Sequence, residues 1–375
     1  MRSRIKVNVP EASSTRFTQG ITHPDLWLWD SWTCKSEGKD HLYCLAFARE
    51  DSQGRPTTPT QRNDFKFHIR HFESEDGGAS WRDCGAIVQS TSEPNATLSD
   101  NVWSGSTLRD RDGTFLFAYT GLPSVSNDRR FLQTICIAES PEPGRVPSLP
   151  LTPVSDPVRD YDSIIAAGYF LGERETLGAN CGESGGPILA WRDPFLFTHG
   201  DRIHALWAAK AGPLQPAVAH AILDRDDSGK IVVDQLLPPI LLPDGDTFTQ
   251  AEVPKVYFDA RGQQFWLIIS GCNRISEDQP DDEIVKDQRL YVSEDLQGPW
   301  VPYRGTTSVI PDIDHLFGAS VIDADFAGRM FRLVAPYTEM ADASVQLTFA
   351  PIASVGIPSA EQVAALLGKS LAGRS

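Results

Sequence analysis

Asp30 stands among tryptophans in a way that suits carbohydrate chemistry. The segment Leu26-Trp27-Leu28-Trp29-Asp30-Ser31-Trp32 places three tryptophans within six residues, around one carboxylate. Aromatic faces stack on the C–H surfaces of sugars, and a carboxylate among them is partly desolvated and available as a nucleophile. The alternative is a core-packing strand that carries a capping aspartate. The segment therefore predicts a carboxylate that is either catalytic or structural.

Two further carboxylates occur in settings that could serve the same chemistry. Asp193 follows Arg192, which would hold it ionised, and such an aspartate can bind sugar hydroxyls and respond to charge on the ring. Glu252 precedes a predicted strand in an apolar setting, which would favour the protonated form that a general acid needs. Taken singly, Asp193 also fits a structural ion pair in a turn, and Glu252 also fits an ordinary exposed glutamate.

Other candidate ligand residues fall into two groups. Trp103 and Ser104 lie in the segment 101–106, where a tryptophan and hydroxyls open another strand and could hold a sugar ring. His68 and His71 form an HxxH pattern, but in an alternating strand their side chains point to opposite faces, which makes a metal site there improbable. The sequence has no glycine-rich phosphate loop, no GxSxG elbow and no Cys–His signature. We therefore expect neither a metal nor a cofactor.

The charge balance narrows the class of partner. The 375 residues include 50 acidic and 34 basic side chains, a formal net charge of −16. Nucleic-acid binders need a basic footprint to neutralise phosphates, and an anionic membrane surface is disfavoured for the same reason. No run of about 18 apolar residues is present, as a membrane-spanning helix would need. A small neutral sugar is the partner that remains, with no nucleic acid and no membrane, and the sequence leaves the oligomeric state open.

The beginning of the chain and its cysteines bear on the compartment. The first residues include two arginines without an apolar stretch after them, so they do not form a secretory signal. We expect a cytoplasmic protein, or a secreted one if a leader has been removed. The six cysteines are widely spaced and form no CxxC pair, which predicts buried thiols of a reduced compartment rather than disulfides or metal ligands. They are Cys34, Cys44, Cys84, Cys136, Cys181 and Cys272.

The elements that must position these residues are overwhelmingly strands. Short apolar or alternating runs, bounded by Gly, Pro, Asp and Asn, predict strands at 41–50, 64–72, 114–122, 131–139, 202–210, 230–237, 264–271 and 330–337. Only 359–372 predicts a good helix, with Ser359 as its N-cap. The fold class is therefore all-β: a sandwich, a barrel or a propeller.

A weak internal repeat favours the propeller. The segment Ser74–Trp81 matches the Asp-box pattern S-x-D-x-G-x-x-W, a hairpin turn in which the aspartate binds turn amides and the tryptophan packs beneath. Ser293–Trp300 is a close variant, and 138–146 and 223–233 look like degraded copies. Intervals of about 65 to 85 residues between the turns predict five blades over 1–375, with 358–375 as a C-terminal helix and tail. Unrelated surface hairpins are the alternative.

Taken together, the motifs resemble glycoside hydrolase family 68, which contains levansucrases, inulosucrases and related β-fructofuranosidases. WDSW near the start, WSGS about 70 residues later, RDP in mid-chain and a Glu-x-Pro motif before a strand follow the order of that family. The segment 289–303 is also similar to the family's strand that ends in S-x-S-L-x-G-P-Y. The resemblance covers about residues 25–340. It implies a single five-bladed β-propeller, in a clan shared with the invertases.

The resemblance also implies roles. Asp30 would be the nucleophile that attacks the anomeric carbon of a fructosyl unit, Asp193 would stabilise the oxocarbenium-like transition state, and Glu252 would be the acid/base. Arg192 would position the sugar, and Trp29, Trp103 and Ser104 would line the fructosyl subsite. The implied reaction is a metal-independent double displacement, in which nucleophile and acid/base stand roughly 5 Å apart.

Two departures from the family pattern concern the leaving-group side. Family members carry Glu-Arg at the acid/base motif, where this chain has Val253, and an acidic residue in the strand after RDP, where this chain has 206–212, LWAAKAG. Arg274, in the following loop, is the candidate replacement for the lost cation. The expected substrate is a small β-fructofuranoside such as sucrose. The alternatives are an intramolecular transfer or cleavage of a different small sugar by the same architecture, and a non-catalytic sugar-binding propeller.

Overall fold

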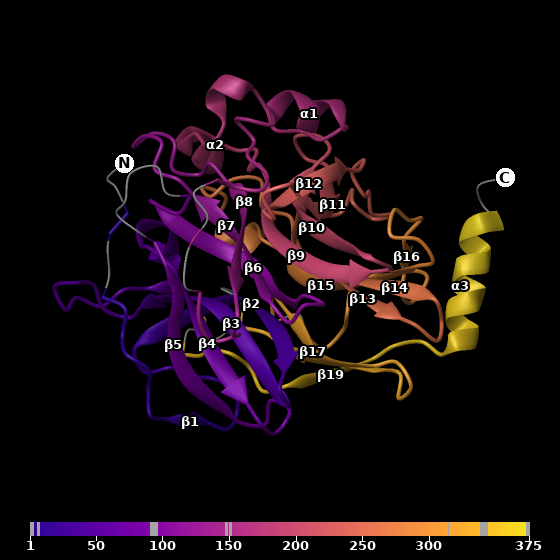
Figure 1. Ribbon diagram of the computed structural model, residues 1–375, viewed down its shortest axis with the longest axis horizontal. Helices are drawn as coiled ribbons and strands as arrows, with labels where there is room; N and C mark the ends of the chain where they lie inside the picture. Colours follow the sequence, from indigo (N-terminus) through magenta and orange to yellow (C-terminus); the bar gives the residue numbers. More distant parts are fainter. Residues whose placement is uncertain are drawn as a thin grey trace.

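The chain folds into five antiparallel sheets arranged as the blades of a β-propeller (Figure 1). A computed structural model describes residues 4–5, 8–90, 97–146, 149, 152–313, 315–337 and 344–372. This architecture confirms the all-β class and the five blades predicted from the sequence.

The blades take their strands in chain order. In sheet order, the first contains β1 (Arg16–Phe17), β5 (Trp81–Gln89), β4 (His68–Ser74), β3 (Lys39–Ala48) and β2 (Leu26–Ser36). The second contains β6 (Asn101–Arg109), β7 (Phe115–Leu122) and β8 (Thr134–Ser140). The third contains β12 (Ile231–Leu236), β11 (Pro216–Arg225), β10 (Arg202–Lys210) and β9 (Arg192–His199). The fourth contains β13 (Gln250–Asp259), β14 (Gln264–Cys272), β15 (Lys286–Ser293) and β16 (Val301–Pro302). The fifth contains β17 (Ser320–Asp325), β18 (Met330–Val334) and β19 (Ala353–Gly356).

Helices are few and lie outside the sheets (Figure 1). The segment between β8 and β9 contains α1 (Tyr161–Ala166) and α2 (Asn180–Gly185), and α3 (Ala360–Ala372) follows the last strand. Three short 3₁₀ helices are η1 (Pro59–Asp64), η2 (Arg174–Thr176) and η3 (Asp281–Glu283). The predicted C-terminal helix is confirmed, and Ser359 caps it by accepting a hydrogen bond from the Gln362 amide at 3.3 Å. Neither α1 nor α2 was expected from the sequence.

The innermost strand of each blade faces the axis of the propeller. β2 contacts β6, β6 contacts β9, β9 contacts β13, and β17 closes the ring against β2. Hydroxyl groups secure this closure: Ser320 donates to the Ser31 carbonyl at 2.6 Å, and Thr33 donates to the Val321 carbonyl at 2.8 Å. The ends of the chain thus fix the first and last blades together around the axis.

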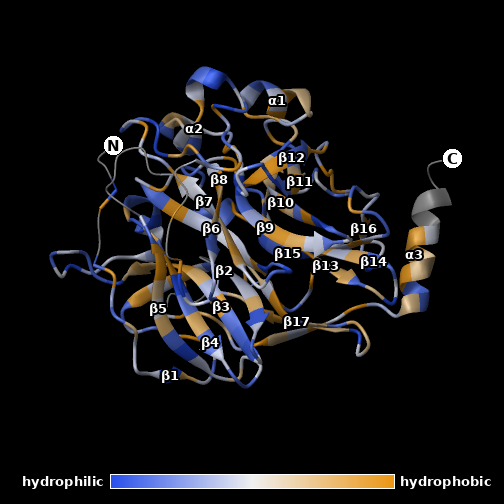
Figure 2. Cartoon of the chain, viewed as in Figure 1, coloured by the Kyte–Doolittle hydropathy of each residue, from blue (hydrophilic) through white to orange (hydrophobic). Residues whose placement is uncertain are grey.

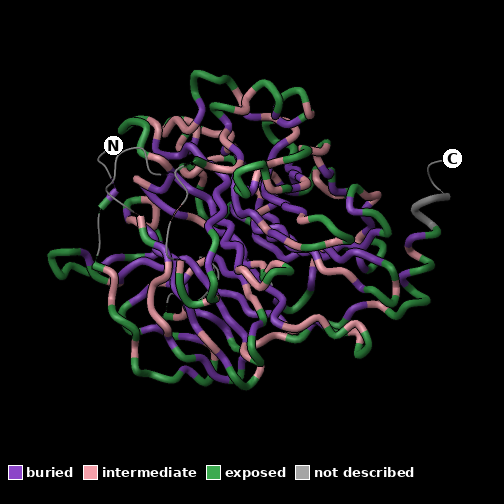
Figure 3. Tube along the Cα trace, viewed as in Figure 1, coloured by how far each residue is buried: buried purple, intermediate pink, exposed green. Residues whose placement is uncertain are grey.

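The middle strands explain the apolar runs in the sequence. Every residue of β7 and every residue of β14 is buried, because each middle strand is covered on both faces by the neighbouring blades. Figure 2 shows the hydrophobic colouring concentrated in the strands, and Figure 3 shows that buried residues follow the same elements while exposed residues follow the connections. The hydrophobic core therefore lies between adjacent blades.

The Asp-box repeat marks equivalent turns. Ser74–Trp81 joins β4 to β5, 223–233 covers the turn from β11 to β12, Ser293–Trp300 joins β15 to β16, and 138–146 follows β8. Each turn therefore comes after the third strand of its blade. In the first, Asp76 Oδ1 accepts a hydrogen bond from the Ser80 amide at 2.8 Å. The interpretation of the pattern as a blade repeat is confirmed, and the turns are not unrelated hairpins.

Most expected strands are present, whereas the prediction that all six cysteines are buried is wrong. The strands predicted at 41–50, 114–122, 202–210 and 264–271 correspond to β3, β7, β10 and β14, with ends that differ by at most three residues. All six cysteines are free thiols, but only Cys44, Cys136 and Cys272 are buried. Cys34 and Cys84 are half-buried, and Cys181 is exposed because it lies at the start of the short surface helix α2. Within the described part of the chain, no helix has the length and apolar character to cross a membrane.

Gly105 permits two strands of the second blade to approach closely, which generates a stability prediction. A Cβ atom at this position would lie 1.9 Å from the Ala118 carbonyl oxygen of the neighbouring strand. Gly105→Ala should therefore lower the free energy of unfolding by on the order of 3 kcal/mol, as overpacking against rigid backbone does. Gly356→Ala is the control, since a Cβ there meets nothing within 4 Å. Chemical denaturation of both variants checks this, and equal stabilities would contradict it.

Candidate active site

The eight site residues predicted from the sequence line one pocket at the propeller axis. They come from four blades and their connections, and are Trp29, Asp30, Trp103, Ser104, Arg192, Asp193, Glu252 and Arg274. Segments up to 245 residues apart in the chain therefore meet here, because the inner strands converge. The fold brings all the candidates together, whereas their chemical roles remain predictions.

Asp30 is held on β2 by a neighbouring blade. The Ser104 hydroxyl of β6 donates a hydrogen bond to Asp30 Oδ2 at 2.7 Å. Gly318 passes close to the other oxygen, since a Cβ there would lie 2.8 Å from Asp30 Oδ1. Burial, together with the nearby charges of Asp193 and Glu252, raises the pKa of Asp30 to about 7. The proton of this carboxyl group is thus exchangeable near neutral pH.

Asp193, the second residue of β9, has an unusual backbone conformation. Its φ is 62°, which places a non-glycine residue in the left-handed region. The Thr120 hydroxyl accepts a hydrogen bond from its amide at 2.8 Å, and its Oδ2 accepts one from the Val253 amide at 3.2 Å. Burial raises the pKa of Asp193 to about 6, and Arg192 opposes this shift without cancelling it. The expectation that Arg192 alone sets its charge state is therefore incomplete.

Glu252 lies beside a cation rather than in the apolar setting expected from the sequence. Arg192 Nη2 is 3.1 Å from Glu252 Oε1, and the Arg192 Nε atom is 3.7 Å from Asp193 Oδ2. The Glu252 side chain is 23% exposed, whereas that of Asp193 is 5% exposed. Of these two carboxylates, Glu252 thus has the better access to solvent.

One extra residue occurs in each inner strand where the site residues lie. In β2, Trp29 and Asp30 lie opposite the single residue Leu45, and in β9 Asp193 and Pro194 lie opposite Trp207. The same irregularity occurs at Ser104 in β6, next to Glu252 in β13, and in β17. A β-bulge turns a side chain away from the regular alternation of a strand. These bulges therefore aim the polar residues into the axial pocket.

Lys255 is a charged residue of the site that sequence reasoning missed. It lies on β13, is 2% exposed, and its Nζ donates to the Val253 carbonyl at 3.1 Å. Burial lowers the pKa of Lys255 to about 8, and the charges of Asp30 and Asp193 oppose that shift. Its place in the Glu-x-Pro-Lys segment, three residues after Glu252, was the available signal.

Aromatic and basic residues complete the pocket. The Trp29 ring lies 5.2 Å from the Arg62 guanidinium carbon and 5.7 Å from the Lys286 Nζ atom. The Trp103 ring is 6.2 Å from that of Phe131. Arg274 forms an ion pair with Asp281 at 2.8 Å and still lines the pocket. The pocket thus combines flat aromatic faces with donors and acceptors, which is the composition that binds sugars.

Other polar residues of the lining were not predicted from the sequence, because each comes from a connection or a strand end without a recognisable motif. The four that carry charge are Arg62, Glu183, Glu277 and Lys286, and Asn63 and Gln250 are further polar residues of the lining.

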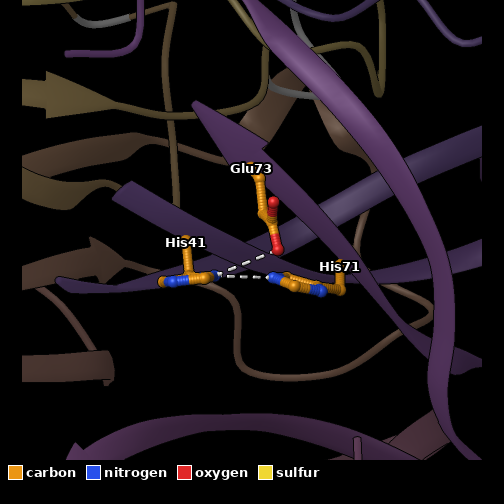
Figure 4. A group of neighbouring side chains, drawn as sticks. All are labelled: His41, His71 and Glu73. Carbon is orange, nitrogen blue, oxygen red and sulfur yellow. Dashed lines mark hydrogen bonds and ion pairs between the residues drawn. The ribbon is translucent and has the colours of Figure 1, made fainter. Parts of the chain in front are cut away.

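Histidines gather elsewhere, in the first blade. Figure 4 shows His41 and His71 with Glu73: His41 Nδ1 lies 3.0 Å from His71 Nε2 and 3.8 Å from Glu73 Oε1. These atoms have the spacing of metal ligands. However, the two imidazole rings are hydrogen-bonded to each other, and Glu73 also forms ion pairs with Lys39 and Arg82. We interpret the group as a hydrogen-bonded histidine pair, formed by His71 with His41 rather than with His68.

Comparison with known structures identifies the fold. Inulosucrase from Halalkalicoccus jeotgali, solved with kestose, superposes with a TM-score of 0.63 at 16% identity, over 96% of this chain and 91% of that one. Bacillus subtilis levansucrase, solved with oligosaccharides, gives 0.62 at 15% identity over 94% and 88%. A Bacillus megaterium levansucrase variant gives 0.60 at 15% identity over 96% and 90%. By sequence, no protein-family profile and no curated protein matches the chain. The shared feature is thus the five-bladed propeller fold of these enzymes.

The buried carboxylates predict an unusual dependence of stability on pH. The pKa of Asp30 is raised from an unfolded value of about 3.9, so its ionisation opposes folding above about pH 7 and has no effect below about pH 4. Asp30→Asn should therefore have a higher melting temperature than the wild type at pH 8, and the difference should shrink towards pH 4.

Asp76→Asn is the matched control, because it should change the melting temperature at pH 8 in the opposite direction. Hydrogen bonds from Ser80 hold the pKa of Asp76 below its usual range, so its ionised form stabilises the fold above about pH 4. This variant should melt below the wild type at pH 8. Thermal melts of both variants at several pH values check the pair, and a destabilised Asp30→Asn protein at pH 8 would contradict the electrostatic account.

Proposed function

We propose that the protein is a retaining glycoside hydrolase or fructosyltransferase that acts on a small β-fructofuranoside such as sucrose through a covalent fructosyl-enzyme. The observation that carries the proposal is the meeting of Asp30, Asp193 and Glu252, from three different blades, in one aromatic-walled pocket. The similarity of fold to inulosucrase and levansucrases supports it. Solved structures of such proteins contain kestose or sucrose.

The first step joins the fructosyl unit to the enzyme. An oxygen of ionised Asp30 attacks the anomeric carbon, Glu252 gives its proton to the glycosidic oxygen, and the bond between these two substrate atoms breaks. Positive charge that develops on the ring is stabilised by Asp193. Arg192 bridges Glu252 and Asp193 and thereby fixes the distance between the acid and the ring.

The second step releases the sugar. Glu252, now a carboxylate, takes a proton from water or from a sugar hydroxyl, whose oxygen attacks the anomeric carbon as the ester bond to Asp30 breaks. Two inversions leave the anomeric configuration retained. Glu252 is suited to this exchange because, at 23% exposure, it can meet an incoming acceptor, whereas Asp193 is closed off.

The residues on the leaving-group side of the pocket point to a second candidate function, in which the donor is a sugar other than sucrose. Val253 offers a buried apolar side chain and uses its amide to hold Asp193, so it cannot supply a cation to a leaving sugar. Arg274 lines the pocket and is the remaining candidate for that role, together with Lys286. Cleavage or intramolecular transfer on a different small sugar is therefore the alternative reaction of the same three carboxylates.

Replacement of the nucleophile tests the proposal directly. Wild-type protein should release fructose, or transfer it, from sucrose or a related β-fructofuranoside, and Asp30→Ala should lower kcat/KM by several orders of magnitude. Time-resolved NMR of the first product should show retained configuration. A protein that cleaves none of these fructosides, or an Asp30→Ala variant as active as the wild type, would refute the mechanism. Sugar binding without turnover would indicate a non-catalytic propeller.

The pH profile tests the state of Asp30. Because its pKa is about 7, kcat/KM should fall as the pH drops below about 7, where the nucleophile becomes protonated. Ser104→Ala removes a donor that favours the carboxylate, so the acidic limb should move to higher pH. Ser106→Ala is the control, because its hydroxyl bonds the Leu196 amide instead of a carboxylate. Identical acidic limbs in both variants would contradict this assignment.

A further inference from the structure

A second cavity adjoins the catalytic pocket. The residues just before β8 and the segment between β8 and β9, which carries α1 and α2 at one side of the propeller (Figure 1), line a cavity of about 310 Å³. Its walls are mainly apolar and include Phe131, Leu171, Leu177, Leu189 and Trp191. The volume is that of a small-molecule site rather than of a packing defect.

Glu183 belongs to both cavities. It lies on α2 and lines the catalytic pocket as well as the apolar cavity. The segment that leads into β9 also runs between them, since Ile188 and Arg192 line the catalytic pocket while Pro187 and Leu189 line the apolar cavity. The two spaces therefore meet at Glu183.

The shared wall is on the acid/base side of the catalytic pocket. Glu183 interacts electrostatically with Arg192 and Glu252, and Arg192 pairs with Glu252 at 3.1 Å. The carboxyl group of Asp30 is held instead by Ser104 of β6, and Glu183 is not among the groups that shift its pKa. In a double displacement the leaving group departs next to the acid, so the apolar cavity lies where the aglycone would be.

Glu183 has an unused polar group at this junction. Its side chain is 9% exposed, and among the described residues none of the hydrogen bonds or ion pairs involves its carboxyl group. Burial raises the pKa of Glu183 to about 8, so the group is mostly a neutral acid at pH 7. A neutral carboxyl group can donate one hydrogen bond and accept another, and a buried one without a partner is costly. It therefore fits a ligand with one polar atom at the junction.

We propose that this cavity is the aglycone subsite of the enzyme and that it takes an alkyl group joined to the fructosyl unit through the glycosidic oxygen. The substrate class is thus an alkyl β-fructofuranoside, an inference that rests on the proposed function. Glucose would fit poorly there, because its hydroxyls would lose water without gaining partners on the apolar walls. Val253, where the resembled family has a cation, agrees with an uncharged, apolar leaving group.

Two glycines of α2 provide a matched pair of variants. A Cβ at Gly182 or at Gly185 meets nothing within 4 Å, so leucine can be introduced at either position without a clash. Gly182 lines the apolar cavity, whereas Gly185 does not. Gly182→Leu therefore fills the cavity, and Gly185→Leu places the same side chain outside it.

The experiment compares hexyl with methyl β-fructofuranoside by the ratio of their kcat/KM values. Wild type and Gly185→Leu should favour the hexyl compound by at least about tenfold, since each buried methylene contributes favourably. Gly182→Leu should bring the ratio close to one. Two results would refute the aglycone subsite while the proposed function stands, provided that the methyl compound is cleaved. One is a hexyl-to-methyl ratio near one in the wild type, and the other is a Gly182→Leu ratio as high as that of the wild type. If sucrose is cleaved but neither alkyl compound is, the subsite is refuted while the proposed function stands. If sucrose is not cleaved either, the proposed function fails and the subsite fails with it.

Cys181 gives a readout that is independent of turnover. It lines the cavity and is exposed, whereas burial raises the pKa of the half-buried Cys34 and Cys84 to about 11. A thiol reagent should therefore label Cys181 first. In the inactive Asp30→Ala protein, hexyl β-fructofuranoside should slow this labelling, and methyl β-fructofuranoside should not. Equal labelling rates with both compounds would overturn the location of the subsite.

Discussion

The structure depends on keeping three carboxylates together at the propeller axis, with Asp30 and Asp193 buried and Glu252 partly exposed. Burial and mutual repulsion both favour protonation, and they raise the pKa values of Asp30 and Asp193. The fold offsets this cost with Arg192, which pairs with Glu252, and with Lys255, whose buried amine lies under the same group. The balance is incomplete, and burial, together with the remaining negative charge, brings the pKa values of Asp30 and Asp193 close to neutral pH.

Geometry imposes a second cost at the same place. Each inner strand contains an extra residue, and Asp193 and Val253 adopt positive φ values of 62° and 43°. For a β-branched residue such as Val253 this conformation is strained. In return, the Val253 amide points at Asp193 Oδ2 and its carbonyl accepts from Lys255. The backbone thus supplies the hydrogen bonds that side chains would otherwise have to make.

The sequence predicted the repeated parts better than the connecting parts. Strand alternation and the Asp-box turns recur in the blades, so periodicity alone indicated five blades, and the tryptophan-rich and RDP motifs located the carboxylates. In contrast, α2 is six residues long and rich in glycine, so neither its length nor its helix propensity gave a signal in the sequence. Glu183 therefore had no local signal. The bulge that turns Glu252 towards Arg192 rather than into an apolar setting depends on pairing between β13 and β14, which the sequence of β13 alone does not contain.

Val253 and Lys255 of β13 affect the electrostatics of opposite sides of the site. The position after Glu252 carries an apolar residue, so the acid faces its leaving group without a cation from its own strand. Lys255 returns a positive charge to the strand, but it is 2% exposed and lies outside the pocket lining, so it serves Asp30 and Asp193 and not the leaving group. The fructosyl side of the pocket is therefore electrostatically supported, while the leaving-group side opens towards Glu183 and the apolar cavity behind it. In the proposed reaction, β13 would therefore support the charge on the fructosyl unit, while the leaving group would face the apolar cavity.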